Sequence, residues 1–81
     1  MNSNTTLFDI NEIDDVLVEQ IVKEVYEALE EKGYNAINQI VGYLISGDPG
    51  YISTYKESRK KISKLERTQI VEVLLRNYIR K

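Results

Sequence analysis

Apolar residues recur every three to four positions through most of this chain, and that spacing constrains its fold more than any other feature. The clearest stretch repeats an apolar residue at every fourth position: Leu17, Ile21, Val25 and Leu29. This pattern predicts an amphipathic helix over residues 14–31. We expect Asp14 or Asp15 to cap its start, and Gly33 to follow its last turn with a positive φ.

A second helix is predicted over residues 36–46, with Asn35 as its N-cap. Gly42 lies inside this helix at a cost of about 1 kcal/mol relative to alanine. We expect another helix to approach it closely in compensation. The helix must end before Pro49, and residues 47–52 carry the strongest turn signal in the chain.

The remaining residues predict two further helices, over residues 54–62 and from about residue 63 to residue 79. Two Ser/Thr-x-x-Glu patterns indicate helix starts: Thr54 with Glu57, and Ser63 with Glu66. One continuous helix over residues 54–79 is the alternative. The last stretch is apolar over nearly half its circumference, which is more than one small neighbour covers.

These elements predict an all-α domain of four to five helices over residues 13–81, preceded by a disordered polar tail over residues 1–12. A chain of 81 residues buries only roughly 60% of the surface that it exposes when unfolded. A monomer would therefore be marginally stable. Together with the wide apolar surface, this favours a homodimer.

The chain contains no cysteine and no histidine, which excludes thiolate nucleophiles, disulfides and the commonest general base and metal ligand. The adjacent acids have poor geometry for acid–base catalysis, so we expect no enzyme activity, cofactor or metal site. No apolar run is long enough for a membrane span, and the first 20 residues are acidic. The composition therefore predicts a soluble, cytoplasmic protein without membrane insertion.

The formal net charge of −2 conceals a strong asymmetry. Residues 1–51 carry ten acids and two bases, a net charge of −8, whereas residues 52–81 carry nine bases and three acids, a net charge of +6. This split favours an acidic element lying near a basic one, within the molecule or across a dimer. A pair of solvated faces of opposite sign is the alternative.

Five of the bases would share one stripe on a continuous helix: Lys56, Arg59, Lys60, Lys64 and Arg67. Such a stripe suits a phosphorylated or acidic protein segment, or the phosphates of nucleic acid. The net acidity and the lack of interleaved aromatic residues argue against nucleic acid. A small DNA-binding regulator therefore remains the alternative function.

Thr5 and Thr6 lie in the polar tail, where a protein kinase could reach their hydroxyl groups. A phosphate would add about −1.5 to −2 charges there.

Residues 32–52, KGYNAINQIVGYLISGDPGYI, closely resemble the signature of the IreB/ReoM family of Gram-positive bacteria. Lys64-Leu65-Glu66-Arg67 followed by Ile70-Val71-Glu72 resembles it too, and the resemblance extends over about residues 16–79. It implies a small all-helical homodimer without catalytic activity, phosphorylated by a membrane-bound Ser/Thr kinase with PASTA repeats. It also implies control of Clp-dependent degradation of the first committed enzyme of peptidoglycan synthesis, and through it resistance to cell-wall antibiotics.

The resemblance also implies roles for individual residues. Thr5, three residues before Phe8, matches the spacing of the family's phosphorylated threonine, and Thr6 is adjacent. Four arginines around the third helix are usual in the family, and Arg59 and Arg67 occupy two of these positions. Thr54 and Ser63 replace the other two, and Ala36 replaces a usual proline. The implied partner-binding residues are Arg59, Arg67, Lys56, Lys64 and Asp48.

Overall fold

The computed structural model describes the backbone of residues 10–81 and the side chains from residue 15 onward. This part of the chain is all-helical, as the apolar spacing predicts. It contains four α-helices and two short 3₁₀ turns, in this order: α1 (Ile10–Glu31), α2 (Ala36–Ser46), η1 (Pro49–Tyr51), η2 (Tyr55–Glu57), α3 (Ser58–Ser63) and α4 (Arg67–Ile79). Of the predicted tail over residues 1–12, residues 1–9 lie outside the described residues, and residues 10–12 belong to α1.

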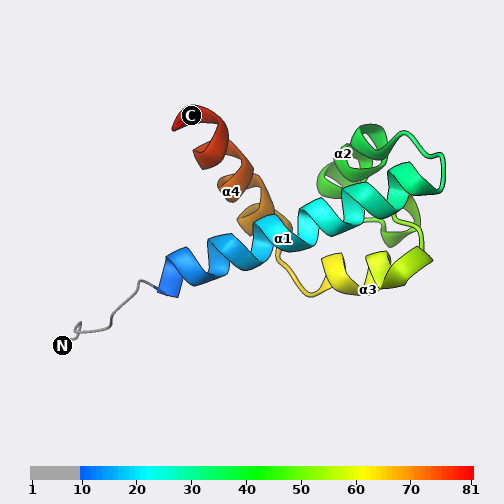
Figure 1. Ribbon diagram of the computed structural model, residues 1–81, viewed down its shortest axis with the longest axis horizontal. Coiled ribbons are helices and arrows are strands. Elements are labelled where there is room, and N and C mark those ends of the chain that lie inside the picture. Colours follow the sequence, from blue (N-terminus) through cyan, green and yellow to red (C-terminus); the bar gives the residue numbers. More distant parts are fainter. Residues whose placement is uncertain (1–9) are drawn as a thin grey trace.

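The long helix α1 forms the spine of the molecule, and α2, α3 and α4 all pack against it. Figure 1 shows α2 and α3 beside the C-terminal half of α1, while α4 leaves α1 near its middle and points away. The helix begins at Ile10, four residues before the predicted start, because the apolar spacing continues back through Ile13 and Ile10. The prediction that Asp14 or Asp15 caps this helix is therefore wrong. Asp15 instead accepts a 2.8 Å hydrogen bond from Arg76 on α4.

Helix α2 has the predicted bounds, and local signals define both of its ends. The Asn35 side chain accepts a hydrogen bond from the Asn38 backbone N–H at 3.1 Å, as an N-cap does. Gly33 has the expected positive φ, and Gly47, with φ of 77°, ends the helix. At Gly42 the prediction of a neighbouring helix is wrong. The close neighbour is the ring of Tyr51, which would lie 2.5 Å from an added Cβ.

The C-terminal half contains two separate helices, so the alternative of one continuous helix is excluded. Lys56 and Glu57 both adopt left-handed backbone angles, with φ of 52° and 62°, and they break the helix just before α3. Neither predicted capping box forms. The Thr54 side chain makes no cap hydrogen bond, and the Ser63 hydroxyl donates to the carbonyl of Lys60 instead. As a result, α4 starts four residues later than predicted.

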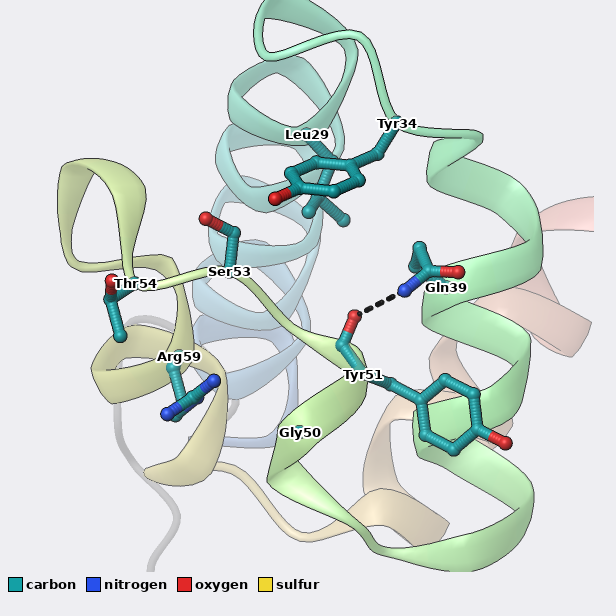
Figure 2. Close-up of a pocket in the computed structure, with 8 residues that line it drawn as sticks. All are labelled: Leu29, Tyr34, Gln39, Gly50, Tyr51, Ser53, Thr54 and Arg59. Carbon is teal, nitrogen blue, oxygen red and sulfur yellow. Dashed lines mark hydrogen bonds between the residues drawn. The ribbon is translucent and has the colours of Figure 1, made fainter.

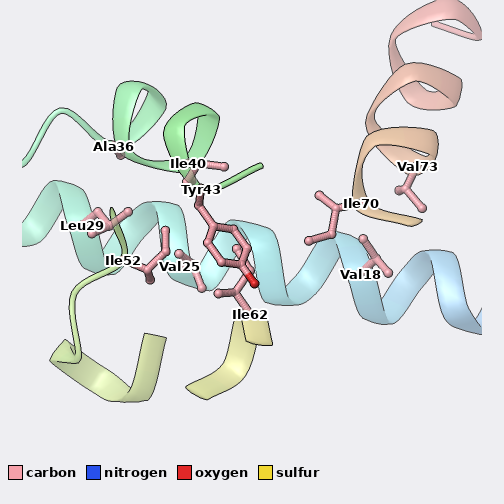
Figure 3. Close-up of a cluster of buried hydrophobic side chains, with 10 residues drawn as sticks. All are labelled: Val18, Val25, Leu29, Ala36, Ile40, Tyr43, Ile52, Ile62, Ile70 and Val73. Atoms are coloured by element: carbon pink, nitrogen blue, oxygen red, sulfur yellow. The ribbon is translucent and has the colours of Figure 1, made fainter. Parts of the chain in front are cut away.

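The buried core follows α1 from Val18 to Leu29, as Figure 3 shows. Most of it lies where α1 meets α2, α3 and the loop between them: Val25, Leu29, Ala36, Ile40, Tyr43, Ile52 and Ile62. The junction with α4 contributes only three buried residues: Val18, Ile70 and Val73. The core therefore fixes α3 firmly, whereas the junction with α4 buries fewer side chains.

Candidate partner-binding surface

The predicted basic stripe is divided among four segments because the chain breaks twice between residues 56 and 67. Lys56 belongs to η2, Arg59 and Lys60 to α3, Lys64 to the turn that follows, and Arg67 to the start of α4. The residues share one region of the molecule, but they do not form a single helical row. We call this region, together with the neighbouring Lys61, the basic side.

Helix α3 is only six residues long, and its position depends on tertiary contacts. Ile62 is fully buried, and the buried Ser58 donates its hydroxyl hydrogen to the carbonyl of Tyr55 at 2.8 Å. The kink before it is held from outside by Lys56, whose Nζ lies 2.8 Å from Glu31 Oε1. Lys32 and Lys56 also lie over the ring of Tyr55, at 5.1 and 5.5 Å from its centroid. These contacts stabilise the left-handed conformation of Lys56 and Glu57, although neither residue is a glycine.

Two ion pairs join the basic side to the acidic face of α1. Besides Lys56 with Glu31, Lys61 Nζ lies 3.1 Å from Glu24 Oε1. The hydrogen bond from Lys61 lowers the pKa of Glu24, with a smaller contribution from Gln20. In the same way, the hydrogen bond from Lys56 lowers the pKa of Glu31, and Glu31 raises the pKa of Lys56. The expectation of an acidic element beside a basic one is thus confirmed within the molecule.

Arg59 lines concave surface on the basic side. Its Nε donates to the carbonyl of Ile52 at 2.9 Å, which fixes the guanidinium against the loop before α3. Two adjacent hollows, of about 230 and 440 Å³, include Arg59 in their walls. Figure 2 shows the smaller hollow, with Arg59 and Thr54 on one side and Tyr34 on the other. Arg59 is therefore both anchored and accessible.

Arg67 and Asp48 both contact the backbone of the protein itself. Arg67 Nη1 donates to the carbonyl of Leu44 at 3.1 Å, at the end of α2. Its guanidinium covers Gly47 so closely that an added Cβ there would lie 2.8 Å from Arg67 Cζ. Asp48 accepts a hydrogen bond from the Gly50 N–H at 2.8 Å and caps η1. The structure thus gives each of these residues a structural contact beside its predicted partner-binding role.

Lys60 and Lys64 are exposed on the outer side of α3. Lys60 Nζ lies 3.9 Å from Glu57, a loose surface pair. Within the described residues, the Lys64 side chain has no hydrogen bond or ion pair. The sequence interpretation overlooked Lys61, Glu24 and Glu31, because their pairing requires α3 to lie along α1. It also overlooked Tyr34, which faces the Arg59 hollow from the far side of the loop.

A second exposed surface is apolar. Helices α2 and α4 leave large apolar side chains exposed, of which Ile37, Val41 and Leu74 line one hollow. The exposed residues are Ile37, Val41, Ile45, Val71, Leu74, Leu75, Tyr78 and Ile79. We call these residues the apolar face. A hollow of about 490 Å³ lies along it between α1, α2 and α4, with Glu19, Lys23 and Asn77 at its rim. Exposed apolar surface of this extent marks an interaction site.

The described residues contain no cluster of three or more acidic side chains that could hold a metal ion. Among the helices of residues 10–81, none combines the length and apolarity that a membrane crossing requires. Thr5 and Thr6, the predicted phosphorylation sites, lie outside the described residues.

A small all-helical chain with a basic side and an uncovered apolar face is suited to contacts with other proteins. Comparison with known protein families agrees that the chain is of a class that acts through contacts with other proteins. The family model described as IreB regulatory phosphoprotein matches residues 3–80 of this chain. The chain therefore belongs to the IreB family of regulatory phosphoproteins. A regulatory phosphoprotein family agrees with the expectation that the chain is not an enzyme.

Proposed function

We propose that this protein is a phosphorylation-controlled regulator whose switch lies in the N-terminal tail. The observation that carries the proposal is the family match over residues 3–80, because it extends through Thr5 and Thr6 as well as the helices. The proposed kinase is a membrane-bound Ser/Thr kinase with PASTA repeats. The proposed output, in the cytoplasm, is control of Clp-dependent turnover of the first committed enzyme of peptidoglycan synthesis, and through it resistance to cell-wall antibiotics.

The basic side is the proposed contact surface for an acidic or phosphorylated protein partner. Arg59, Lys60 and Lys64 supply its exposed charge, and an arginine can hold a carboxylate or phosphate with two parallel hydrogen bonds. A phosphate on the tail adds negative charge to the same molecule. Such a charge changes how an acidic partner approaches the basic side, either by repelling the partner or by competing with it.

The apolar face is the proposed homodimer interface. Ile37 is 59% exposed and Leu75 54% exposed, so leaving this surface in water is unfavourable. A second copy brings an identical apolar face, which is the simplest complementary surface that a chain of this kind encounters. Dimerisation would also supply the burial that so small a domain lacks.

Two experiments test the regulatory proposal. Incubation with the kinase, followed by mass spectrometry, should place the phosphate on Thr5 or Thr6, and a Thr5→Ala/Thr6→Ala variant should remain unmodified. Phosphate found only on a helical residue such as Thr68 would contradict the tail model. A pulldown comparing the wild type with Thr5→Glu should then lose or gain one partner, with Ser3→Glu as the control for charge alone.

The alternative function, DNA binding, predicts a gel-shift affinity that falls steeply with salt. The arrangement of the described basic residues gives little support to DNA binding. Lys56 and Lys61 pair with α1 carboxylates, and Arg67 bonds to the backbone at the end of α2. No single helix presents the basic residues as a row that could lie along a groove.

A further inference from the structure

The hollow beside Arg59 has the composition of a small anion-binding pocket. It measures about 230 Å³ and is lined mainly by groups that donate hydrogen bonds: Tyr34, Gln39, Ser53, Thr54 and Arg59. Figure 2 shows the Tyr34 hydroxyl directed toward the side of the pocket where Ser53 and Thr54 lie. No acidic side chain lines it. The adjacent hollow of about 440 Å³ also contains Arg59, but Glu57 lines that one.

Arg59 is held in a geometry that suits phosphate recognition. Its Nε donates to the carbonyl of Ile52, and its own backbone N–H donates to the carbonyl of Ser53. Within the described residues, its two terminal nitrogens make no hydrogen bond. A guanidinium fixed at Nε and open at both terminal nitrogens offers the planar two-point contact that phosphate oxygens accept. Because the side chain is already ordered, binding loses little conformational entropy.

The other polar groups of the pocket are also oriented. Gln39 donates its Nε2 hydrogen to the carbonyl of Tyr51 at 3.0 Å, which holds the side chain across the loop. The Ser53 hydroxyl oxygen accepts from the Tyr55 N–H at 3.0 Å, so its own hydrogen remains for another acceptor. A group with several acceptor oxygens and negative charge fits this set better than a neutral ligand does.

We propose that this pocket binds the phosphate monoester of a phosphorylated side chain, with Arg59 as the main contact and Tyr34, Ser53 and Thr54 as hydroxyl donors. The inference rests on the proposed function in treating the basic side as a contact surface. It assigns that surface a defined pocket and a defined ligand group. It does not depend on which kinase adds the phosphate.

The tail of the same molecule is too short to supply this phosphate. Leu29, which lines the pocket, follows Ile10 by 19 residues within α1, about 28 Å along the helix axis. Thr5 precedes Ile10 by five residues, which span at most about 18 Å when fully extended. The proposed source is therefore a second copy of this chain, phosphorylated in its tail, and inorganic phosphate is the other source of the same anion that the test distinguishes.

Titration of the full-length, ¹⁵N-labelled protein tests the pocket. The ligands are a peptide of residues 1–12 phosphorylated at Thr5, the same peptide without phosphate, and inorganic phosphate alone. We expect the phosphopeptide to shift the amide signals of Ser53, Thr54 and Arg59, and the unmodified peptide to leave them in place. Equal binding by inorganic phosphate would support the pocket and assign it to the free anion.

Matched variants separate the pocket from general electrostatics. Arg59→Gln should weaken phosphopeptide binding by about tenfold or more, whereas Lys64→Gln removes the same charge outside the pocket and should change it little. Tyr34→Phe loses one donor without disturbing the Arg59 anchor, and it should weaken binding by a smaller factor. Unchanged affinity in both Arg59→Gln and Tyr34→Phe, or shifts confined to residues 60–64, would overturn the proposal. Neither result bears on whether the kinase modifies Thr5, so the two proposals fail separately.

Discussion

The two ends of α1 are packed very differently. At its C-terminal end, three elements surround the helix and bury a continuous core that includes Leu29, Ile52 and Ile62. At the other end, α4 covers the helix alone and buries only Ile70 and Val73 of its 13 residues. Figure 3 shows Ile70 and Val73 of α4 beside Val18 of α1, at one end of the core. The C-terminal end of α1 is buried in a core, while at the other end many apolar side chains of α4 remain exposed to solvent.

Stability and interaction are therefore located at opposite ends of α1. The packed end holds the loop and α3 that carry the Arg59 pocket, so that its donors stay in place. The sparsely packed end exposes apolar side chains of α4, such as Leu75 at 54% and Ile79 at 74%. Those residues contribute little to folding a monomer, because they gain burial only against another surface.

The largest expected effect is in the packed core. Ile62→Ala removes a fully buried side chain that fixes α3, and it should lower the free energy of unfolding by about 2–5 kcal/mol. A domain of this size has roughly 4–12 kcal/mol in total, so the melting temperature should fall sharply. Val16→Ala is the control, since Val16 is 62% exposed and lies outside the apolar face, and the change should stay within about 0.5 kcal/mol. Similar losses at both positions in urea denaturation would contradict the packing contrast.

The next effect is on the apolar face. Ile37→Glu places a charge in the hollow beside α1 and α4 and should weaken self-association at least about tenfold, with little loss of helix content. An acid in the first turn of α2 is itself favourable, so the fold should persist. Sedimentation equilibrium measures the dissociation constant, and circular dichroism checks the fold. Asn38→Glu adds the same charge one residue away and should leave the dimer intact. A wild type that stays monomeric at high concentration would refute the dimer.

A third effect isolates one contact of the packed end. Gly42→Ala should gain about 0.5–1 kcal/mol of helix propensity, yet it should be destabilising by about 1 kcal/mol net, because the new Cβ displaces the ring of Tyr51. In a Tyr51→Ala background, where the ring is absent, the same substitution should become stabilising. Thermal unfolding of the four proteins in this double-mutant cycle measures the coupling. Additive effects would show that the Tyr51 ring is not the reason that position 42 requires glycine.

Much of the fold follows from local signals. Asn35 and Gly47 define the ends of α2, because a cap and a left-handed glycine act within a few residues of the chain. The start of α3 could not be predicted in this way. Its preceding kink uses Lys56 and Glu57, which favour the left-handed region poorly, and the tertiary ion pair of Lys56 with Glu31 compensates.

The sequence predicted the charged composition of the candidate surface, but it did not predict how the side chains are arranged. The charge split indicated that acidic and basic elements would meet, and Arg59 and Arg67 were singled out by the spacing of the basic stripe and again through the family resemblance. Whether each guanidinium faces solvent or the backbone depends on loops that fold only in three dimensions. Arg59 approaches Ile52, seven residues back, whereas Arg67 approaches Leu44, 23 residues back. Sequence spacing carries no signal for the second of these contacts.

The smallest expected effect is a response to acid at the packed end. The pKa values of Glu24 and Glu31 are lowered by their lysine partners, so the folded state binds protons more weakly than the unfolded state does. Their contribution to stability is complete above the ordinary glutamate pKa of 4.5, and it is lost as the pH falls through the lowered values. Glu24→Gln/Glu31→Gln should therefore flatten the decline of melting temperature below pH 4.5, while Glu30→Gln should not. Because both pairs are solvent-exposed, the difference should be small and should shrink further in high salt. An equally steep decline in the double variant would show that hydrophobic burial alone holds α3 against α1.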